Sequence, residues 1–495
     1  MFRHPHFKLR GAVQPVRLFP SLPAALHVHC QINTFTFLNI KHDFKDNINW
    51  NESRYGKLWT YNLTYFEFLH SSRVTKSDGL RLIHDFIDQI EDIKDGVEPF
   101  PTALRIMNWI KFVGQHNIWD GKIDRSLYQQ THLLLDQLEY HLLGNHLLEN
   151  GFALFFAAYY FQSNEFYAAA KKILEPELEE QILADGVHFE LSPMYHQWML
   201  YRVLDCCNLI KRQDFFDDTL NDTLRSKASL MLGALEQLTF LSGDIALLND
   251  SAFDIAPTSR ELLEYARRLN IEKKSVKLKE SGYRRINKGR YELLIDIGEI
   301  GPTYIPGHAH CDMLSFVLYV GGAPFIVDTG TSTYEANDTR QQERSTAAHN
   351  TVMVNDKEQS EIWSAFRVAN RARIVEIKEG DNWVEATHNG YQEMGIYHRR
   401  RFEWTADQIV IKDFIQSKGE TDHKATAYLH FAPAVFVQLD KRNIETQKGS
   451  VTFATESTID SEQSIYQFAP TFNRTVEAIR VDIHFDRHLE TRINI

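Results

Sequence analysis

Three histidines and an aspartate in the second half of the chain have the side chains and the spacing of a metal site. His308 and His310 are one residue apart, and Asp328 and His349 follow. Zinc accepts imidazole nitrogen and carboxylate oxygen in tetrahedral geometry. We interpret the segment as β, and on a strand the first two histidines would share a face. Alternatively, they are ordinary polar residues at a strand edge; Asp328 and His349 favour the metal site.

A second polar group stands upstream, at the end of a strong helix pattern. Asn145 and Glu149 are spaced to share one helix face, with His146 beside them. The leucines around these three residues indicate that they line a pocket. The alternative is a helix C-terminus capped by Asn150 and Gly151, which would leave Asn145 and His146 unexplained.

Two tyrosines, one at a predicted helix start and one in a polar loop, are candidates for a reactive role. Ser192 followed by Pro193 is a good helix start, so Tyr195 is expected in a first helical turn. A lone tyrosine is more often a core aromatic. Tyr334 opens a polar loop that ends at Arg344 and lies between the last two metal candidates. Arg340 and Arg344 there could hold an acid group of a substrate, or the loop could simply be solvated.

Composition narrows the class of protein. A chain of 495 residues should fold as two or three domains. The net charge of −12 argues against nucleic acid as a partner, although a local cationic cleft could still bind an acidic polysaccharide. No run approaches the ~20 apolar residues of a membrane span. The first residues lack the apolar core of a signal peptide, so we expect a cytoplasmic protein, or a periplasmic one if a leader has been removed.

The chain divides by the period of its apolar residues. Helical spacing dominates from about residue 75 to residue 275, and alternation with turn residues follows from about residue 283. Consecutive amphipathic helices predict helix-on-helix layers that could close into a toroid, and the short strands predict a large antiparallel sandwich. We therefore expect an α+β multidomain protein with a lead-in over 1–50, a helical domain over 51–280 and a β-sandwich over 281–495.

Taken together, the motifs resemble the heparinase II/III family of polysaccharide lyases and the related alginate lyases. Each motif is weak alone, but several in the family's order are specific. In chain order they are Trp59 to Phe66, Arg105 to Trp109, Asn145 to Gly151, Ser192 to His196, Leu248 to Ser251, Gly307 to Asp312 and Thr346 to Val352.

The resemblance implies an incomplete (α/α) toroid followed by an antiparallel β-sandwich, and β-elimination on a uronic acid. In the family's pattern Asn145 and His146 neutralise the uronate carboxylate, and Tyr195 and His308 are the acid and base in an order left open. Tyr334 is expected beside them, and Glu149 matches one branch of the family. The resemblance also implies one structural zinc ion, and its matched ligands are His310, Asp328 and His349. Candidates for substrate binding are Arg105, Asn108, Asn249 and Arg344.

Substrate identity is less determined by the sequence. A glycosaminoglycan such as heparin or heparan sulfate is the first choice, with alginate or another uronate-containing bacterial polysaccharide as alternatives. The basic run His398 to Arg401 could bind acid groups or be a solvated strand face. A non-catalytic carbohydrate-binding protein is one rival class. A glycoside hydrolase is another, and it needs two carboxylates, for which Glu149, Glu190 and Asp250 are available. The chain could act alone or as a homodimer.

Overall fold

The computed structural model describes residue 21 and residues 29–31, 33–211, 215–216, 219–304, 306–417, 423–455 and 459–495. The chain divides into two compact units. The first consists of Met1–Ile182, Gln197–Leu232 and Asp254–Lys274; the second consists of Leu183–His196, Gly233–Phe253 and Ser275–Ile495. The long C-terminal segment thus begins close to the predicted boundary at 280, but two earlier segments also belong to the second unit.

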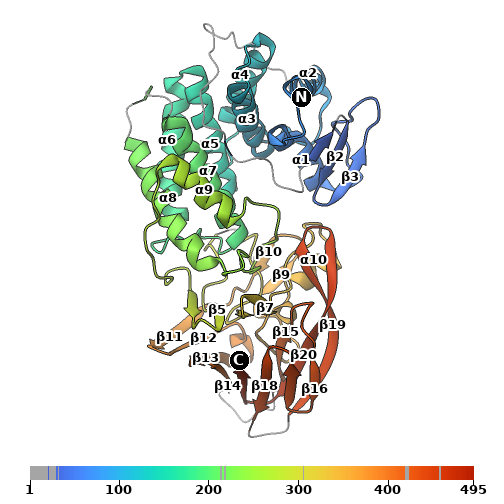
Figure 1. Ribbon diagram of the computed structural model, residues 1–495, viewed down its shortest axis with the longest axis vertical. Helices are drawn as coiled ribbons and strands as arrows, with labels where there is room; N and C mark the ends of the chain where they lie inside the picture. The colour runs from blue at the N-terminus through green and yellow to red at the C-terminus, as the bar shows by residue number, and fades with distance from the viewer. Residues whose placement is uncertain are drawn as a thin grey trace. The chain divides into compact units, whose positions relative to one another are not determined.

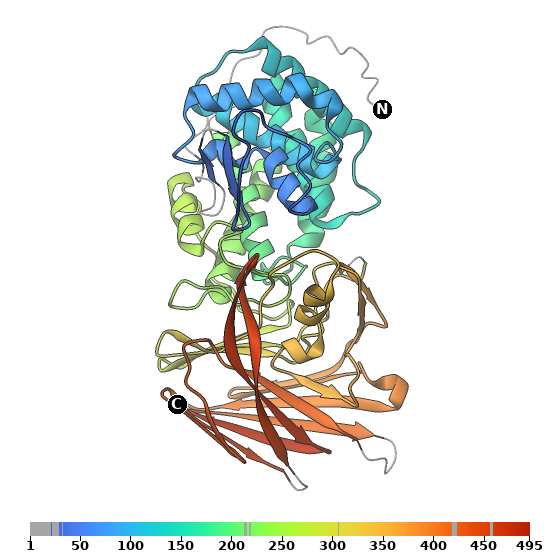
Figure 2. The same cartoon turned by 90° about the vertical axis from the view of Figure 1, so that its right-hand side faces the viewer.

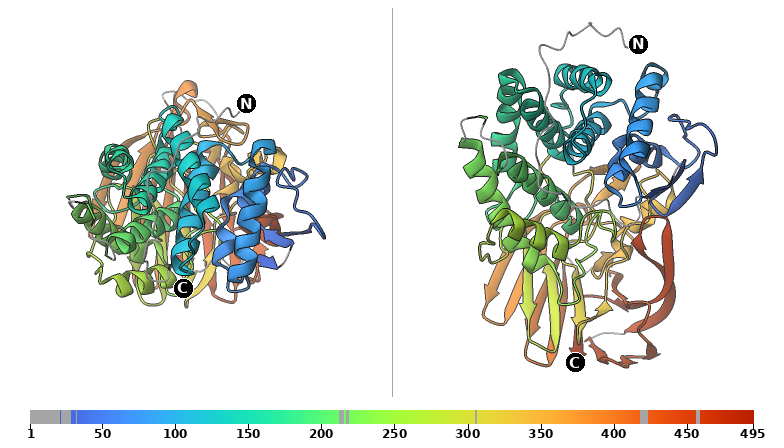
Figure 3. Two further views of the ribbon diagram at one scale, coloured as in Figure 1. Left: turned by 90° about the horizontal axis from the view of Figure 1, so that it is seen from above. Right: turned by 45° about the horizontal axis from the view of Figure 1, so that its top comes forward.

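The first unit is helical, as predicted, and its helices pack on one another (Figure 1). Helix α3 contacts α1, α4 and α5, and α5 lies beside α6, as Figure 3 also shows. Helices α7 and α8 have residues in both units. The helices are α1 (Lys57–Tyr65), α2 (Lys76–Gln89), α3 (Pro99–Gln115), α4 (Gly121–Asp136), α5 (Gly144–Phe161), α6 (Asn164–Gln181), α7 (Pro193–Lys211), α8 (Thr219–Leu238) and α9 (Ser259–Leu269).

The predicted lead-in contains a small antiparallel sheet in its described part. Its strands, in spatial order, are β1 (His29–Gln31), β2 (Thr34–Phe37) and β3 (Ile40–Asp43). Phe35 and Phe37 of β2 are fully buried and pack against Phe68 of the helical unit. This segment is therefore part of the first unit's core. None of the described helices is long and apolar enough to span a bilayer.

The start of α5 corrects the sequence interpretation. The Asn145 motif begins this helix and does not end the preceding one, and Asn150 and Gly151 lie inside it. Leu143 and Gly144 have φ values of 57° and 55°, a left-handed conformation that interrupts a helix. A Cβ atom on Gly151 would lie 2.9 Å from side-chain atoms of Ile173 and Leu174 in α6. The glycine is therefore explained by close helix packing and not by a C-cap.

The second unit is built on antiparallel sheets, as predicted. An eight-stranded sheet has the order β11-β12-β13-β14-β21-β18-β17-β16, and two four-stranded sheets have the orders β19-β20-β15-β8 and β4-β5-β6-β7. A two-stranded sheet pairs β10 with β9. Figure 2 shows β19 and β20 as a long red hairpin.

The bounds of these strands, and of the one short α-helix among them, follow the chain. They are β4 (Tyr283–Asn287), β5 (Tyr291–Asp296), β6 (Phe316–Val320), β7 (Ala323–Ile326), α10 (Asp338–Glu343), β8 (Val352–Val354), β9 (Glu361–Trp363), β10 (Arg367–Ala369), β11 (Ile374–Gly380), β12 (Trp383–His388), β13 (Ile396–Trp404), β14 (Gln408–Ser417), β15 (Ala425–His430), β16 (Gln438–Asp440), β17 (Asn443–Thr446), β18 (Gly449–Ala454), β19 (Asp460–Thr471), β20 (Arg474–Phe485) and β21 (His488–Asn494).

Strand β5 explains why two segments from the helical half of the sequence belong to the second unit. All six of its residues are buried. Leu293 and Ile295 belong to the core between the sheets, whereas Leu294 belongs to a second core with Leu191 and Leu248. Side chains alternate between the faces of a strand, so the sheet β4–β7 is covered on both faces. Residues from 183–196 and 233–253 pack against the face of this sheet that carries Leu294.

Candidate active site

Three predicted catalytic side chains of the second unit lie together. The rings of Tyr195 and His308 have centroids 4.1 Å apart, and the hydroxyls of Tyr195 and Tyr334 are 3.4 Å apart. The hydroxyl oxygen of Ser192 accepts a hydrogen bond from the backbone N–H of Tyr195 at 3.2 Å, which confirms the predicted helix start. The sequence therefore brings one imidazole and two phenols to one place, beside Phe366.

A buried carboxylate, Asp250, holds this cluster in position. It accepts hydrogen bonds from His308 Nδ1 at 2.8 Å and from His310 Nε2 at 2.9 Å. The guanidinium of Arg340 binds both oxygens of the same carboxylate and lies 5.0 Å from the ring centroid of Tyr334. Because a carboxylate only accepts hydrogen bonds, the proton of a neutral His308 is on Nδ1, and Nε2 has a free lone pair.

The predicted strand for the two histidines is wrong. Residues 307 and 308 lie in a turn, and the next strand, β6, begins only at Phe316. The turn is closed by a bond from the Ala309 N–H to the Pro306 carbonyl at 3.2 Å. The Ser315 N–H also bonds back to the Asp312 carbonyl at 3.0 Å, so the backbone turns again before β6 begins. His308 and His310 meet at one carboxylate and not on one strand face.

Burial shapes the ionisation of the cluster. Burial alone would raise the pKa of Asp250, but the Arg340 guanidinium and the two histidines hold that pKa well below its usual range. Burial raises the pKa of Tyr195 and of Tyr334 above the ordinary value for a phenol. Both tyrosines are therefore protonated at neutral pH, and Asp250 is ionised.

The metal candidates have suitable atoms, but they do not form a preformed set. Among the described residues, no group of three or more His, Cys, Asp or Glu side chains is arranged to hold a metal ion. His349 Nδ1 donates to Asp328 Oδ2 at 2.7 Å, so the predicted ligand Asp328 binds a histidine here. Within the described structure the buried atoms His310 Nδ1, His349 Nε2 and Asp312 Oδ2 have no hydrogen-bond partner. Two free imidazole nitrogens and a free carboxylate oxygen fit the donor types that zinc takes.

The predicted residues of the helical unit lie in the first two turns of α5. Asn145 is buried, and His146 is partly exposed with Nδ1 3.1 Å from Glu139 Oε1. Glu149 is fully buried and accepts hydrogen bonds from Arg202 Nε at 2.9 Å and from Trp198 Nε1 at 2.8 Å. This ion pair gives Glu149 a structural task, and the catalytic roles of all three α5 residues stay predictions.

The four predicted substrate-binding residues are all buried and bonded within the protein. Arg105 donates to the Gly96 carbonyl at 2.7 Å and to Gln130 Oε1 at 2.7 Å. Asn108 donates to a backbone carbonyl at 2.9 Å, and Asn249 donates to one at 3.1 Å. Arg344 donates to the Ala309 carbonyl at 3.2 Å. Through these contacts the four side chains stabilise the local structure. The same contacts weigh against direct binding of substrate by these residues.

Two residues of the cluster were not in the predicted site. Asp250 stands in one of the recognised motifs, and Arg340 was noted only as a cation that could meet an acidic substrate. Both residues therefore drew attention in the sequence. Their ion pair was missed because the two residues are 90 positions apart in the chain. The basic run of β13 was also ambiguous. There Arg400 is buried and bound to Asp413 at 2.6 Å, while its neighbours Arg399 and Arg401 are partly exposed.

Solved structures share this fold. Heparinase III superposes with a TM-score of 0.72 at 16% identity, over 91% of this chain and 79% of that chain. A mutant of the heparan sulfate lyase HepC from Pedobacter heparinus gives 0.63 at 15% identity, over 94% and 81%. The Streptomyces coelicolor A3 chondroitin AC lyase in complex with chondroitin sulphate gives 0.53 at 9% identity, over 89% and 74%. At these identities the likeness confirms the predicted fold class, a helical toroid followed by antiparallel β-sheets.

Comparison of sequences gives the family. A curated relative, the FtsZ-localized protein C of Caulobacter vibrioides (strain NA1000 / CB15N), is 26% identical over 298 residues, which cover 55% of this chain and 49% of that protein. The chain thus spans about half the length of this relative. The family profile described as heparinase II/III N-terminus matches residues 123–266, and that described as heparinase II/III-like, C-terminal, matches residues 270–495. The chain therefore belongs to the heparinase II/III-like family.

Proposed function

We propose that this protein cleaves a uronic-acid-containing polysaccharide by β-elimination and leaves a 4,5-unsaturated uronate end. The observation that supports this proposal best is the cluster of Tyr195, His308 and Tyr334 held by Asp250. It combines a proton acceptor with proton donors in one place. A glycosaminoglycan is the substrate that we put first, and another uronate polysaccharide or alginate is the alternative.

The cluster suits the two proton transfers of the reaction. His308 Nε2 accepts the proton from C5 of the uronate, since its Nδ1 is occupied by Asp250. The C4–O4 bond breaks as the C4=C5 bond forms, and the Tyr195 hydroxyl gives its proton to the departing O4. Burial raises the pKa of Tyr195, which keeps the phenol protonated before the reaction and therefore suits it to the role of donor and not of base. Proton exchange with water then returns both groups to their starting states.

Removal of the C5 proton needs a neutralised carboxylate, because charge develops on that group in the transition state. We assign this task to Asn145 and His146 on the strength of the family pattern. An Asn145→Ala variant should then lower kcat far more than it changes the affinity for the polysaccharide. A variant with full turnover would remove Asn145 from the mechanism.

A glycoside hydrolase is the less suitable class. It requires two carboxylates that flank the glycosidic bond. One acts as the acid, and the other acts as the base or the nucleophile. Of the candidate carboxylates, Glu149 is locked to Arg202 and Asp250 to Arg340, and both are fully buried. The Arg340 guanidinium and the two histidines hold the pKa of Asp250 well below its usual range, so this carboxyl is poorly suited to donate a proton.

The proposal is tested by incubating the purified protein with heparin, heparan sulfate, chondroitin, hyaluronan and alginate. A lyase generates the ultraviolet absorbance of the unsaturated uronate on at least one of them, and the responding polymer identifies the substrate. A hydrolase would release reducing ends without that absorbance. A binding protein would do neither, while still retaining the polymer on an affinity column.

We also propose one structural zinc ion, bound by His310, Asp328 and His349. The free nitrogens of the two histidines support it. So does the bond of the other His310 nitrogen to Asp250, because ligating histidines commonly donate their second ring N–H to a carboxylate. Bound zinc would tie the turn that carries His308 to the rest of the sandwich. Asp328→Asn and Asp312→Asn, compared by elemental analysis, would identify which carboxylate contributes the oxygen.

A further inference from the structure

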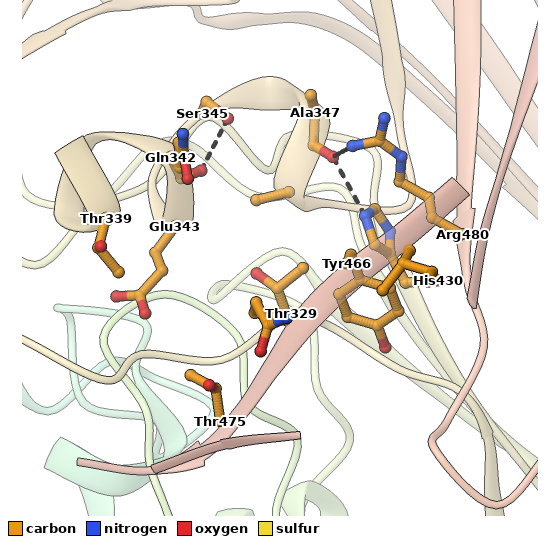
Figure 4. Close-up of a pocket in the computed structure, with 13 residues that line it drawn as sticks. Thr329, Thr339, Gln342, Glu343, Ser345, Ala347, His430, Tyr466, Thr475 and Arg480 are labelled. Carbon is orange, nitrogen blue, oxygen red and sulfur yellow. Dashed lines mark hydrogen bonds between the residues drawn. The ribbon is translucent and has the colours of Figure 1, made fainter. Parts of the chain in front are cut away.

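A cavity of about 570 Å³ lies in the second unit, beside α10 and the hairpin of β19 and β20 (Figure 4). Neither Tyr195 nor His308 lines it. Figure 4 shows Glu343 on one side of the opening and Tyr466, His430 and Arg480 on the other, with Thr329 between them. Its size is within the range of small-molecule sites.

Two buried polar side chains of the wall each carry one oxygen without a hydrogen-bond partner among the described residues. Thr329 is 6% exposed and Glu343 is 7% exposed, and both line the cavity. Within the described structure Thr329 Oγ1 and Glu343 Oε2 have no hydrogen-bond partner. Glu343 Oε1, by contrast, accepts from the Ser332 N–H at 3.0 Å. Buried polar atoms are almost always satisfied in proteins, so a ligand or water that offers hydroxyl groups should bind these two atoms.

The charged side chains that line the cavity are largely neutralised. Arg480 is bound to Asp482 by two hydrogen bonds of 2.6 Å. Burial raises the pKa of Glu343 to about 7, so near neutral pH much of this carboxyl is uncharged and can both donate and accept. Burial and the nearby Arg480 keep the pKa of His430 well below its usual value. An anionic ligand would therefore gain less here than an uncharged one.

The remaining wall offers apolar surface beside these polar groups. Ile465, which is 64% exposed, and Ala348 line the cavity with Tyr466. The Tyr466 hydroxyl donates to the Phe431 carbonyl at 2.9 Å, which fixes its ring. A pocket that combines an aromatic ring, aliphatic groups and a few hydroxyl, amide and carboxyl groups suits a ligand with one apolar face and several hydroxyls.

We propose that this cavity binds an uncharged sugar unit, with hydroxyls on Thr329 Oγ1 and Glu343 Oε2 and an apolar face toward Ile465 and Tyr466. The proposal rests on the proposed function for the source of that unit, because the non-uronate sugars of a polysaccharide substrate would supply it. It does not require catalysis at Tyr195.

The test uses methyl N-acetyl-β-D-glucosaminide and D-glucuronate as probes, with saturation-transfer NMR on the full-length protein. The Tyr195→Phe variant is measured in parallel, so that binding is scored in the absence of turnover. Thr329→Val keeps the shape of the side chain and removes only its unpaired hydroxyl. Thr452→Val makes the same chemical change at a partly exposed position of β18 outside the cavity and is the matched control.

We expect the uncharged probe to bind better than glucuronate, and Thr329→Val to weaken it about fivefold, the weight of one net hydrogen bond. Thr452→Val should bind like the parent. If Thr329→Val does not fold, Thr475→Trp, which fills the cavity from an exposed position, should abolish binding. Absence of binding to the parent, or equal binding in the parent and Thr329→Val, would overturn the proposal and mean that water alone occupies the cavity. An inactive protein that still binds the probe would reject only the lyase proposal.

Discussion

The carboxylate of Asp250 connects the two sets of histidine chemistry at the scale of single residues. One of its oxygens meets His308, a predicted catalytic residue, and the other meets His310, a predicted zinc ligand. Sequence motifs were sufficient to predict Tyr195, His308 and Tyr334 as neighbours. They were insufficient to predict the ion pair of Asp250 and Arg340. The partner of a buried carboxylate depends on the tertiary structure and cannot be identified from the spacing of residues in the sequence.

Asp250→Asn should strongly destabilise the protein. The substitution would leave the Arg340 guanidinium, which is fully buried, without its counter-charge, and breaking such a pair typically costs about 3–5 kcal/mol. Urea unfolding followed by circular dichroism would measure the loss. Asp440→Asn, at an exposed position of β16, is the control and should change the free energy of unfolding by less than about 0.5 kcal/mol. Equal stability of the two variants would contradict the structural role of Asp250.

His308→Ala and His310→Ala should differ in metal content. We expect His308→Ala to lose activity and to keep about one zinc per chain, because its imidazole is assigned to proton transfer. His310→Ala should lose zinc and stability together, because metal binding is coupled to folding. Elemental analysis and thermal unfolding of both proteins would check the contrast. Zinc-free wild-type protein with full activity would refute the metal proposal.

Helix α5 illustrates, at the scale of elements, what a periodic pattern can and cannot reveal. The apolar run predicted a buried helix correctly, since Phe152 to Tyr160 are all buried. The boundary was wrong because leucines continue through the loop of residues 137–143 that separates α4 from α5, so the apolar pattern does not show the break. The strand pattern failed similarly before Phe316, where a turn interrupts an apolar sequence.

Gly151→Ala should destabilise the contact between α5 and α6. Its Cβ would lie 2.9 Å from both Ile173 and Leu174, and overpacking of this kind typically costs about 1–3 kcal/mol. Gly121→Ala, at the start of α4, is the matched control, because its Cβ would have no neighbour closer than 3.6 Å. Higher helix propensity of alanine should leave that variant as stable as wild type or slightly more so. Chemical denaturation of both variants would decide.

The β13–β14 pair should make the sandwich sensitive to acid. Burial alone would raise the pKa of Asp413, but Arg400 and His398 lower it to about 2. An unfolded aspartate titrates near ~3.9, so this carboxylate stabilises the fold above about pH 4 and loses that contribution as the pH falls toward 2. The full loss is about 2.6 kcal/mol. Unfolding measured from pH 6 to pH 2.5 should show a steeper decline for wild type than for Asp413→Asn; parallel curves would contradict the assignment.

The division into a helical and a sheet-rich part was predictable at the scale of the whole molecule, because the apolar period changes near residue 280. It was not predictable that residues 183–196 and 233–253 belong to the second unit. Those residues include helical turns, and they join the second unit because their apolar side chains cover the second face of the sheet β4–β7. Tyr195 and Asp250 both lie in these segments. The unit that contains the proton-transfer cluster is therefore assembled from three separate stretches of chain.

The central claim, β-elimination at this cluster, is tested most directly by the rate of unsaturated uronate formation by wild-type protein and by Tyr195→Phe. The substitution removes one oxygen, which lies 3.4 Å from the Tyr334 hydroxyl, so the fold should survive. General acid–base catalysis contributes about 10²–10⁴-fold. We predict ultraviolet absorbance from wild type on a glycosaminoglycan and a loss of at least ~10²-fold in the folded variant. Absence of unsaturated product on every uronate polymer, or equal rates from the two proteins, would contradict the account.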